Sequence, residues 1–132
     1  MRKFLIAGTF IMLTHFAYSQ EVDFKKNTVL VDGKECIKMS NEDAVSVSYS
    51  DMEGNELIMM RFIHGSRYGS VYNKVVFLNE KLSFTSQSYV YTKKMLIKRL
   101  VKDKVIENCK INRENLEKFI MKYDENVEKA GN

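Results

Sequence analysis

Six runs rich in apolar residues between positions 28 and 85 predict β-strands, and one of them alternates apolar and polar residues with a period of two, the pattern of a strand with one buried face. This run is residues 44–50, where Val45, Val47 and Tyr49 alternate with serines and should share one face of a strand. The remaining strand-like runs lie at residues 28–31, 34–39, 56–63, 74–78 and 82–85.

The connections between these runs are short, which favours antiparallel pairing. Asp32-Gly33 tolerates the positive φ angles of a two-residue hairpin turn. The run 56–63 is apolar on both faces apart from Arg61, which indicates a central strand. Residues 64–73, which include two glycines and two serines, are predicted to form a long loop.

The apolar period changes to three and four in the last third of the chain, which predicts helices. Asn112 is a suitable N-cap for the final helix, and Glu114 in the first turn suits the positive end of the helix dipole. The expected apolar stripe of this helix consists of Leu116, Phe119, Ile120, Tyr123 and Val127.

An earlier helix is expected from about Ser88 to Asp103, with Leu96, Ile97, Leu100 and Val101 on one side. This longer helix places Lys93 in the apolar arc, so that its stem would have to snorkel out. In the alternative, the preceding strand extends to Tyr91 and Thr92 caps a shorter helix. We favour the longer helix.

Strands first and helices last predict an α+β fold: an antiparallel sheet of about five to six strands in the N-terminal two-thirds, packed by two C-terminal helices. Residues 20–132 have the size of a single α+β domain with one hydrophobic core.

Residues 1–19 have the three parts of a secretory signal peptide. Arg2 and Lys3 precede a ten-residue apolar stretch, and Ala17-x-Ser19 provides the small residues of a cleavage site. A membrane-spanning helix needs about 20 apolar residues, so this stretch is too short to serve as one. We expect an exported protein, periplasmic or secreted, with no membrane span after cleavage; the alternative is an uncleaved membrane anchor.

Charge changes this picture little. Removing residues 1–19 takes away Arg2 and Lys3 and lowers the net charge from +4 to +2, too small a surplus to indicate nucleic-acid or membrane-surface binding. The outer side of the first helix is nevertheless basic, through Lys94, Lys98, Arg99 and Lys102. It is either an ordinary solvated face or, in an exported protein, a surface for anionic glycans, lipid headgroups or an acidic partner.

No catalytic residue, metal site or cofactor is assigned. His64 is the only histidine after residue 19, and no nucleophile motif accompanies it. A zinc site built from Cys36, Cys109 and His64 would lack the close ligand spacings that such sites use.

The segment 64–73 is the most unusual stretch of the chain. Tyr and Arg among small residues are typical of recognition surfaces. We therefore predict that this loop binds a ligand or partner through His64, Arg67, Tyr68 and Tyr72; the alternative is an inert hairpin loop.

Cys36 and Cys109 are an even pair in a chain expected to reach an oxidising compartment. A disulfide between them would tie the first hairpin to the connection between the helices. Two separate buried thiols are the alternative, and the sequence leaves both open.

The chain resembles small exported proteins of unknown function from Bacteroidetes. The resemblance covers most of residues 20–132 and rests on structural motifs: Tyr18-Ser19-Gln20, Val31–Lys34, Gly54–Ile58, and the closing pattern from Leu100 to Ile120. It implies a periplasmic or secreted setting and carries over no site residue.

These patterns favour an exported, non-enzymatic binding or interaction domain, with a protein or glycan partner in the cell envelope and no nucleic-acid partner. A small extracytoplasmic hydrolase or carbohydrate-active enzyme is the first alternative, and an envelope assembly or stress factor is the second.

Overall fold

The structure is a computed structural model that describes residues 20–67 and 69–129. The predicted signal peptide (1–19) and Tyr68 lie outside the described residues. The main sheet consists of β1 (Val22–Lys25), β2 (Thr28–Val31), β3 (Lys34–Asp43), β4 (Ser46–Asp51), β5 (Glu56–Ser66), β6 (Gly69–Phe77) and β7 (Leu82–Ser86).

Seven strands lie in the sheet in the order of the chain, and each pairs antiparallel with the next. The predicted α+β class and antiparallel pairing are confirmed, but the expected number of five to six strands is wrong. The additional strand is β1, whose four residues alternate but whose turn to β2, at Lys26-Asn27, lacks the glycine that marks the next hairpin in the sequence. Asp32 and Gly33, with φ angles of 53° and 81°, form the predicted turn between β2 and β3.

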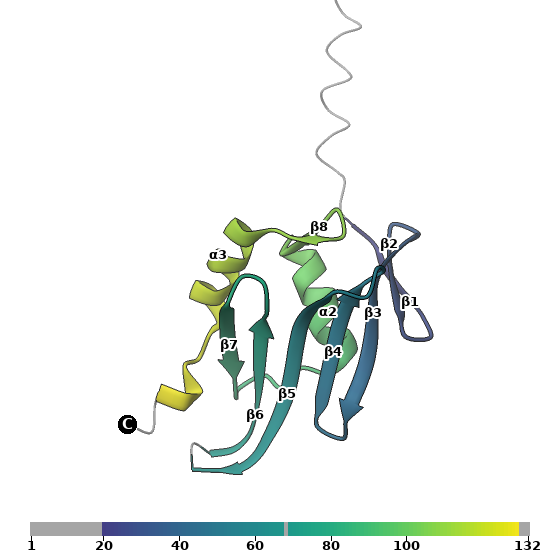
Figure 1. Ribbon diagram of the computed structural model, residues 1–132. Helices are drawn as coiled ribbons and strands as arrows, with labels where there is room; N and C mark the ends of the chain where they lie inside the picture. Colours follow the sequence, from purple (N-terminus) through teal and green to yellow (C-terminus); the bar gives the residue numbers. More distant parts are fainter. Residues whose placement is uncertain (1–19, 68, 130–132) are drawn as a thin grey trace, which may run out of the picture.

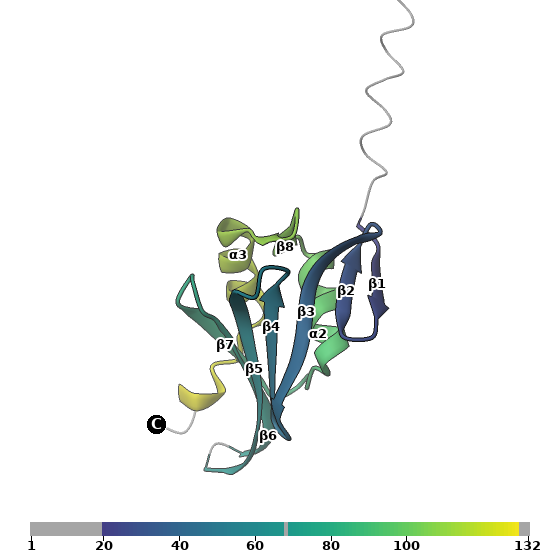
Figure 2. The ribbon, with the colours of Figure 1, turned by 45° about the vertical axis from the view of Figure 1, so that its right-hand side comes forward.

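The last third of the chain contains α2 (Lys93–Lys102), a two-stranded hairpin of β8 (Ile106–Glu107) and β9 (Lys110–Ile111), α3 (Arg113–Tyr123) and a short 3₁₀ helix, η2 (Val127–Lys129). Both long helices lie on the same side of the twisted sheet (Figures 1 and 2). The hairpin between the helices is too short to show a strand period in the sequence.

Helix α2 begins later than predicted. The side chain of Thr92 accepts a hydrogen bond from the backbone N–H of Met95 at 3.2 Å and caps the helix. The favoured start at Ser88 is therefore wrong and the cap proposed in the alternative is confirmed, although β7 ends at Ser86 and does not reach Tyr91. Lys93 becomes the first helical residue, which removes the need for it to lie in the middle of the apolar arc.

Helix α3 is capped by Asn112 as predicted, through a hydrogen bond from the Asn115 N–H at 3.0 Å. Leu116 and Phe119 are buried, but the helix ends at Tyr123. Val127 is buried as part of η2 and does not continue the helical stripe.

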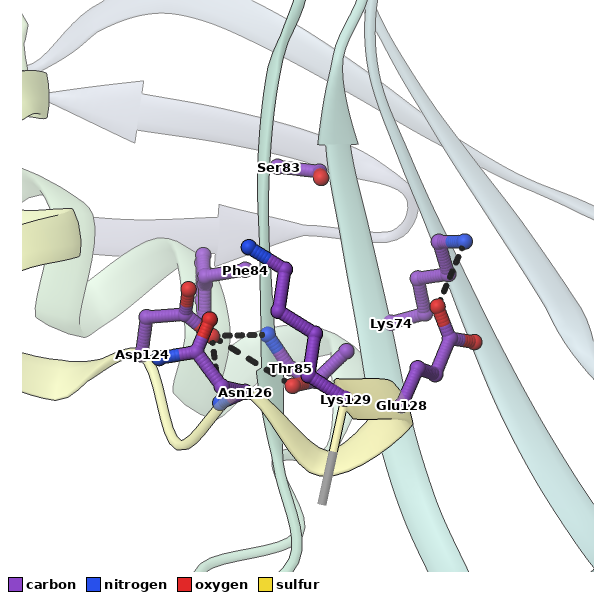
Figure 3. Close-up of a pocket in the computed structure, with 8 residues that line it drawn as sticks. All are labelled: Lys74, Ser83, Phe84, Thr85, Asp124, Asn126, Glu128 and Lys129. Atoms are coloured by element: carbon purple, nitrogen blue, oxygen red, sulfur yellow. Dashed lines mark hydrogen bonds and ion pairs between the residues drawn. The ribbon is translucent and has the colours of Figure 1, made fainter. Parts of the chain in front are cut away.

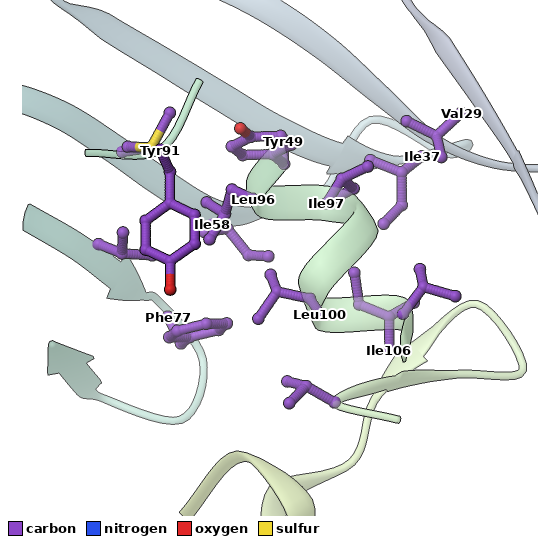
Figure 4. Close-up of a cluster of buried hydrophobic side chains, with 14 of the residues drawn as sticks. Val29, Ile37, Tyr49, Ile58, Phe77, Tyr91, Leu96, Ile97, Leu100 and Ile106 are labelled. Atoms are coloured by element: carbon purple, nitrogen blue, oxygen red, sulfur yellow. The ribbon is translucent and has the colours of Figure 1, made fainter. Parts of the chain in front are cut away.

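One hydrophobic core lies between the sheet and the helices. Leu96, Ile97 and Leu100 of α2 are fully buried. Figure 4 shows them among buried side chains from the strands, including Val29, Ile37, Tyr49, Ile58 and Phe77. Burial raises the pKa of the Tyr49 phenol, whose hydroxyl donates to the Lys93 carbonyl at 2.8 Å and so ties the centre of the sheet to the start of α2.

Cys36 and Cys109 form a disulfide, with 5.1 Å between their Cα atoms. Cys36 lies on β3 and Cys109 in the turn between β8 and β9, so that the bond joins the first part of the sheet to the connection between the helices. The bonded alternative of the sequence analysis is thus the one found in the structure. Such a bond is compatible with an oxidising, exported location.

The C-terminal segment covers the outer edge of β7. The Thr85 N–H donates to the Asp124 carboxylate at 3.0 Å, and the Glu125 N–H donates to the Thr85 carbonyl at 2.9 Å. Backbone groups that a neighbouring strand would otherwise pair are satisfied in this way, which protects the edge from pairing with another chain.

Candidate binding surface

Residues 64–73 are not the long loop that the sequence predicted. Strand β5 continues to Ser66 and β6 begins at Gly69, with Ser66 and Gly69 paired across the hairpin. Small residues have low strand propensity, but pairing with a neighbouring strand overrides this weak preference.

The four residues predicted to bind a ligand therefore have different environments. His64 is exposed on β5, and Arg67 is exposed in the turn that follows it. Tyr72 is buried on β6, and its hydroxyl donates to the Glu128 carboxylate at 2.8 Å. Tyr68 lies outside the described residues. In this conformation Tyr72 holds the C-terminal segment in place, and its ring is buried.

A small pocket of about 180 Å³ lies where the C-terminal segment crosses β6 and β7 (Figure 3). Its polar groups bond to one another. Asp124 accepts from both the N–H and the hydroxyl of Thr85, and Glu128 accepts from Lys74 at 2.9 Å. The Lys74 ammonium holds the pKa of Glu128 below its usual value. This network holds the C-terminal segment against the sheet, and few polar groups of the pocket remain available for a ligand.

The strongest candidate surface lies on α2. The ten residues of this helix include five cations and no carboxylate. Lys94, Lys98 and Lys102 follow one another at four-residue spacing, where like charges repel. Within residues 20–67 and 69–129, the salt bridges join Lys74 to Glu128, Arg113 to Glu117 and Lys118 to Glu114, and none involves α2.

Aromatic rings take the place of carboxylates beside these cations. The Lys94 and Lys98 ammonium groups lie 5.2 and 5.8 Å from the centroid of the Phe24 ring. The Arg99 guanidinium lies over two rings, 5.9 Å from that of Tyr89 and 5.0 Å from that of Tyr123. Cation–π contacts of this kind hold a positive group in position without neutralising its charge.

We call this set of four cations (Lys94, Lys98, Arg99 and Lys102) and three rings (Phe24, Tyr89 and Tyr123) the basic–aromatic surface. The sequence identified the four cations but none of the three rings beside them. The three rings come from β1, from the segment before α2 and from α3, and no local spacing in the sequence links them.

Two contacts fix the segment that carries Tyr89. The buried side chain of Asn73 bonds to the backbone N–H and carbonyl of Tyr91. The Glu125 carboxylate accepts from the N–H groups of Gln87 and Ser88 at 2.8 and 3.0 Å. The Tyr89 ring, in turn, packs edge-on against Tyr91 with 4.6 Å between centroids. Tyr89 is nevertheless 43% exposed, so that a rigid segment presents its ring to solvent.

The described part of the chain contains no cluster of three or more His, Cys, Asp or Glu side chains arranged to hold a metal ion. None of its helices is long and apolar enough to span a membrane. Comparison with known protein families, curated proteins and solved structures finds no match.

Proposed function

We propose that the protein is an exported binding domain that holds an anionic partner in the cell envelope on its basic–aromatic surface. The observation that carries this proposal is the charge of α2, whose five cations make no salt bridge among the described residues. The Cys36–Cys109 disulfide supports the exported setting, because disulfides persist in oxidising compartments.

The charge distribution also supports binding of anions at one surface rather than nonspecific binding over the whole domain. Residues 20–132 carry a net charge of only +2, whereas α2 alone carries +5, so the rest of the domain is net acidic. An anionic partner would be attracted to one face and repelled by the others.

Retention of residues 20–132 on immobilised dextran sulfate, compared with neutral dextran, tests the proposal. We expect the domain to bind the sulfated polymer, and the variant Lys94→Glu/Lys98→Glu/Lys102→Glu to bind at least tenfold more weakly. Raising the salt concentration should weaken the wild-type interaction, because ions screen exposed charges.

The matched control is Lys34→Glu/Lys38→Glu/Lys110→Glu, which reverses the same number of charges at exposed positions away from α2. This variant should keep most of the affinity. Equal losses in the two variants would show that only net charge matters, and absence of binding by the wild type would refute the proposal.

A further inference from the structure

Two shallow hollows are lined by the two rings over which Arg99 lies, Tyr89 and Tyr123. The first, of about 190 Å³, is lined by Tyr89, Met95, Lys98, Arg99 and Lys102. The second, of about 240 Å³, is lined by Asp103, Asn115, Lys118, Phe119, Lys122 and Tyr123. The Arg99 guanidinium lies over the Tyr89 ring, which lines the first hollow, and over the Tyr123 ring, which lines the second, so that one side chain contacts a wall of each hollow. We call the pair of hollows the Arg99 groove.

The groove combines apolar walls with a cationic rim. Tyr89 and Met95 supply apolar surface in the first hollow, and Phe119 and Tyr123 supply it in the second. Lysines border both, and Asp103 is the only carboxylate in either lining. A ligand that fits must therefore carry negative charge and also present flat apolar surface.

Arg99 is the group best placed to orient such a ligand. Among the described residues its side chain takes part in no hydrogen bond or salt bridge, only in contacts with the two rings. Stacking on aromatic faces leaves the in-plane N–H groups of a guanidinium free to donate to a carboxylate in a bidentate manner. The rings also restrict the movement of Arg99, so that less entropy is lost on binding.

The size of the hollows indicates a chain of small units. Pockets for drug-sized ligands enclose about 300–1,000 Å³, and each hollow is smaller than that. Two such hollows, with one arginine in contact with a wall of each, suit consecutive rings of a linear polymer.

A lipid surface fits the groove less well. Membrane-binding faces gather their apolar side chains beneath a layer of cations. Within the part of the chain that the structure describes, the other exposed large apolar residues are Leu78 after β6, Val90 next to Tyr89, and Met121 on α3. Leu78 and Met121 thus lie on separate elements and leave Tyr89 and Val90 as the only adjacent pair among them.

We propose that the Arg99 groove binds an acidic oligosaccharide, with adjacent uronate units in its two hollows. The C–H faces of the sugars pack on the Tyr89 and Tyr123 rings, and a uronate carboxylate accepts hydrogen bonds from Arg99. This inference rests on the proposed function and names the class of partner that the basic–aromatic surface selects.

Calorimetric titration of residues 20–132 with tetragalacturonate, and with a neutral tetrasaccharide for comparison, tests this assignment. The acidic sugar should bind, and the neutral sugar should bind at least tenfold more weakly. Tyr89→Ala should reduce the affinity at least fivefold by removing the exposed ring, whereas Tyr89→Phe should retain it. Arg99→Lys keeps the charge but loses the planar donors and should also reduce the affinity at least fivefold.

Tyr89→Ala and Arg99→Lys keep the charge of the wild type, so each should weaken binding to dextran sulfate less than it weakens binding to tetragalacturonate. If the wild type binds dextran sulfate but not tetragalacturonate, or binds the uronate equally well after Tyr89→Ala, the groove assignment is wrong while the proposed function stands. If the wild type binds neither dextran sulfate nor tetragalacturonate, both the groove assignment and the proposed function are wrong.

Vesicles of phosphatidylglycerol provide the remaining comparison. Binding to these vesicles but not to the uronate would overturn the groove assignment in favour of a lipid surface. Tyr89→Ala keeps the test decisive even if Arg99→Lys fails to fold, because Tyr89 is 43% exposed and lies outside the hydrophobic core, so that removing its ring should not disturb the core.

Discussion

The side chain of Asn73 holds in place a segment that lies 18 residues further along the chain. Asn73 is fully buried on β6, and its side chain pairs with both backbone polar groups of Tyr91. These bonds replace a strand partner for a segment that belongs to no sheet. The Tyr89 ring owes its fixed position to this contact. The sequence could not indicate it, because Asn73 lay at the end of a predicted loop, where asparagine is common.

Asn73→Ala should therefore destabilise the domain by about 2 kcal/mol or more, because it leaves a buried N–H and a buried carbonyl without partners. Urea denaturation monitors this loss. Asn79→Ala, at an exposed position just after β6, is the control and should change the free energy of unfolding by less than about 0.5 kcal/mol. A small effect of Asn73→Ala would show that water can replace the side chain.

At the scale of the elements, apolar runs and turn signals in the sequence predicted six of the seven strands of the sheet and both long helices. Strand β1 was missed although its four residues alternate, because no glycine marks the turn that joins it to β2. The β8–β9 hairpin was missed because strands of two residues are too short to show a period.

Two predictions, the start of α2 and the loop at residues 64–73, were wrong because local residue preferences were misleading. The start of α2 was misplaced because the residues from Ser88 to Tyr91 lack a helix breaker, although Thr92 provides the cap. Part of β5 and β6 was interpreted as a loop because glycine and serine disfavour strands locally. In the candidate surface, the α2 cations were visible in the sequence, whereas the rings that flank them meet only in the fold.

Two carboxylates of the C-terminal segment, Glu125 and Glu128, predict how the stability of the fold depends on pH. Burial acts to raise the pKa of Glu125, but the N–H donors of Ser88 and Gln87 outweigh it, so that the pKa lies below its usual value. The hydrogen bond from Lys74 lowers the pKa of Glu128. For groups with a lowered folded-state pKa, the stabilisation is present above the unfolded-state pKa of about 4.3 and is lost as the pH falls through the folded-state value.

We expect the free energy of unfolding to decrease as the pH is lowered from about 5 towards 3. The variant Glu125→Gln/Glu128→Gln should be less stable at pH 7 by about 1–2 kcal/mol and should depend less on pH in the acid range. Chemical denaturation at several pH values measures both quantities. Glu114→Gln, at a largely exposed position on α3, is the control. An unchanged acid dependence in the double variant would mean that other carboxylates govern acid unfolding.

At the scale of the whole molecule, an acidic part and a basic part of the chain are linked by one covalent bond. Residues 35–56, which span most of β3, all of β4 and the connection to β5, carry six carboxylates and one lysine, whereas α2 carries only cations. The disulfide links these unlike parts, because it joins β3 to the hairpin that follows α2. It therefore constrains the position of the basic–aromatic surface relative to the sheet as well as the stability of the fold.

The disulfide closes a separation of 73 residues, and on the chain-entropy model it stabilises the domain by about 4 kcal/mol. Cys36→Ala/Cys109→Ala should lose a large part of this free energy, measured by denaturation of the oxidised wild type and the variant under the same conditions. Titration of the unfolded, unreduced wild type should find no free thiol, and two free thiols per chain would show that the bond does not form.

A second variant separates the covalent bond from the backbone at Cys109. Asn108 and Cys109 have φ angles of 53° and 62°, in the left-handed region that favours glycine at the second position of a two-residue turn. Cys36→Ala/Cys109→Gly also lacks the disulfide but relieves the turn, so it should be more stable than Cys36→Ala/Cys109→Ala by about 1 kcal/mol. If the two variants are equally stable, the turn adapts once it is released from β3, and the bond itself imposes the left-handed conformation.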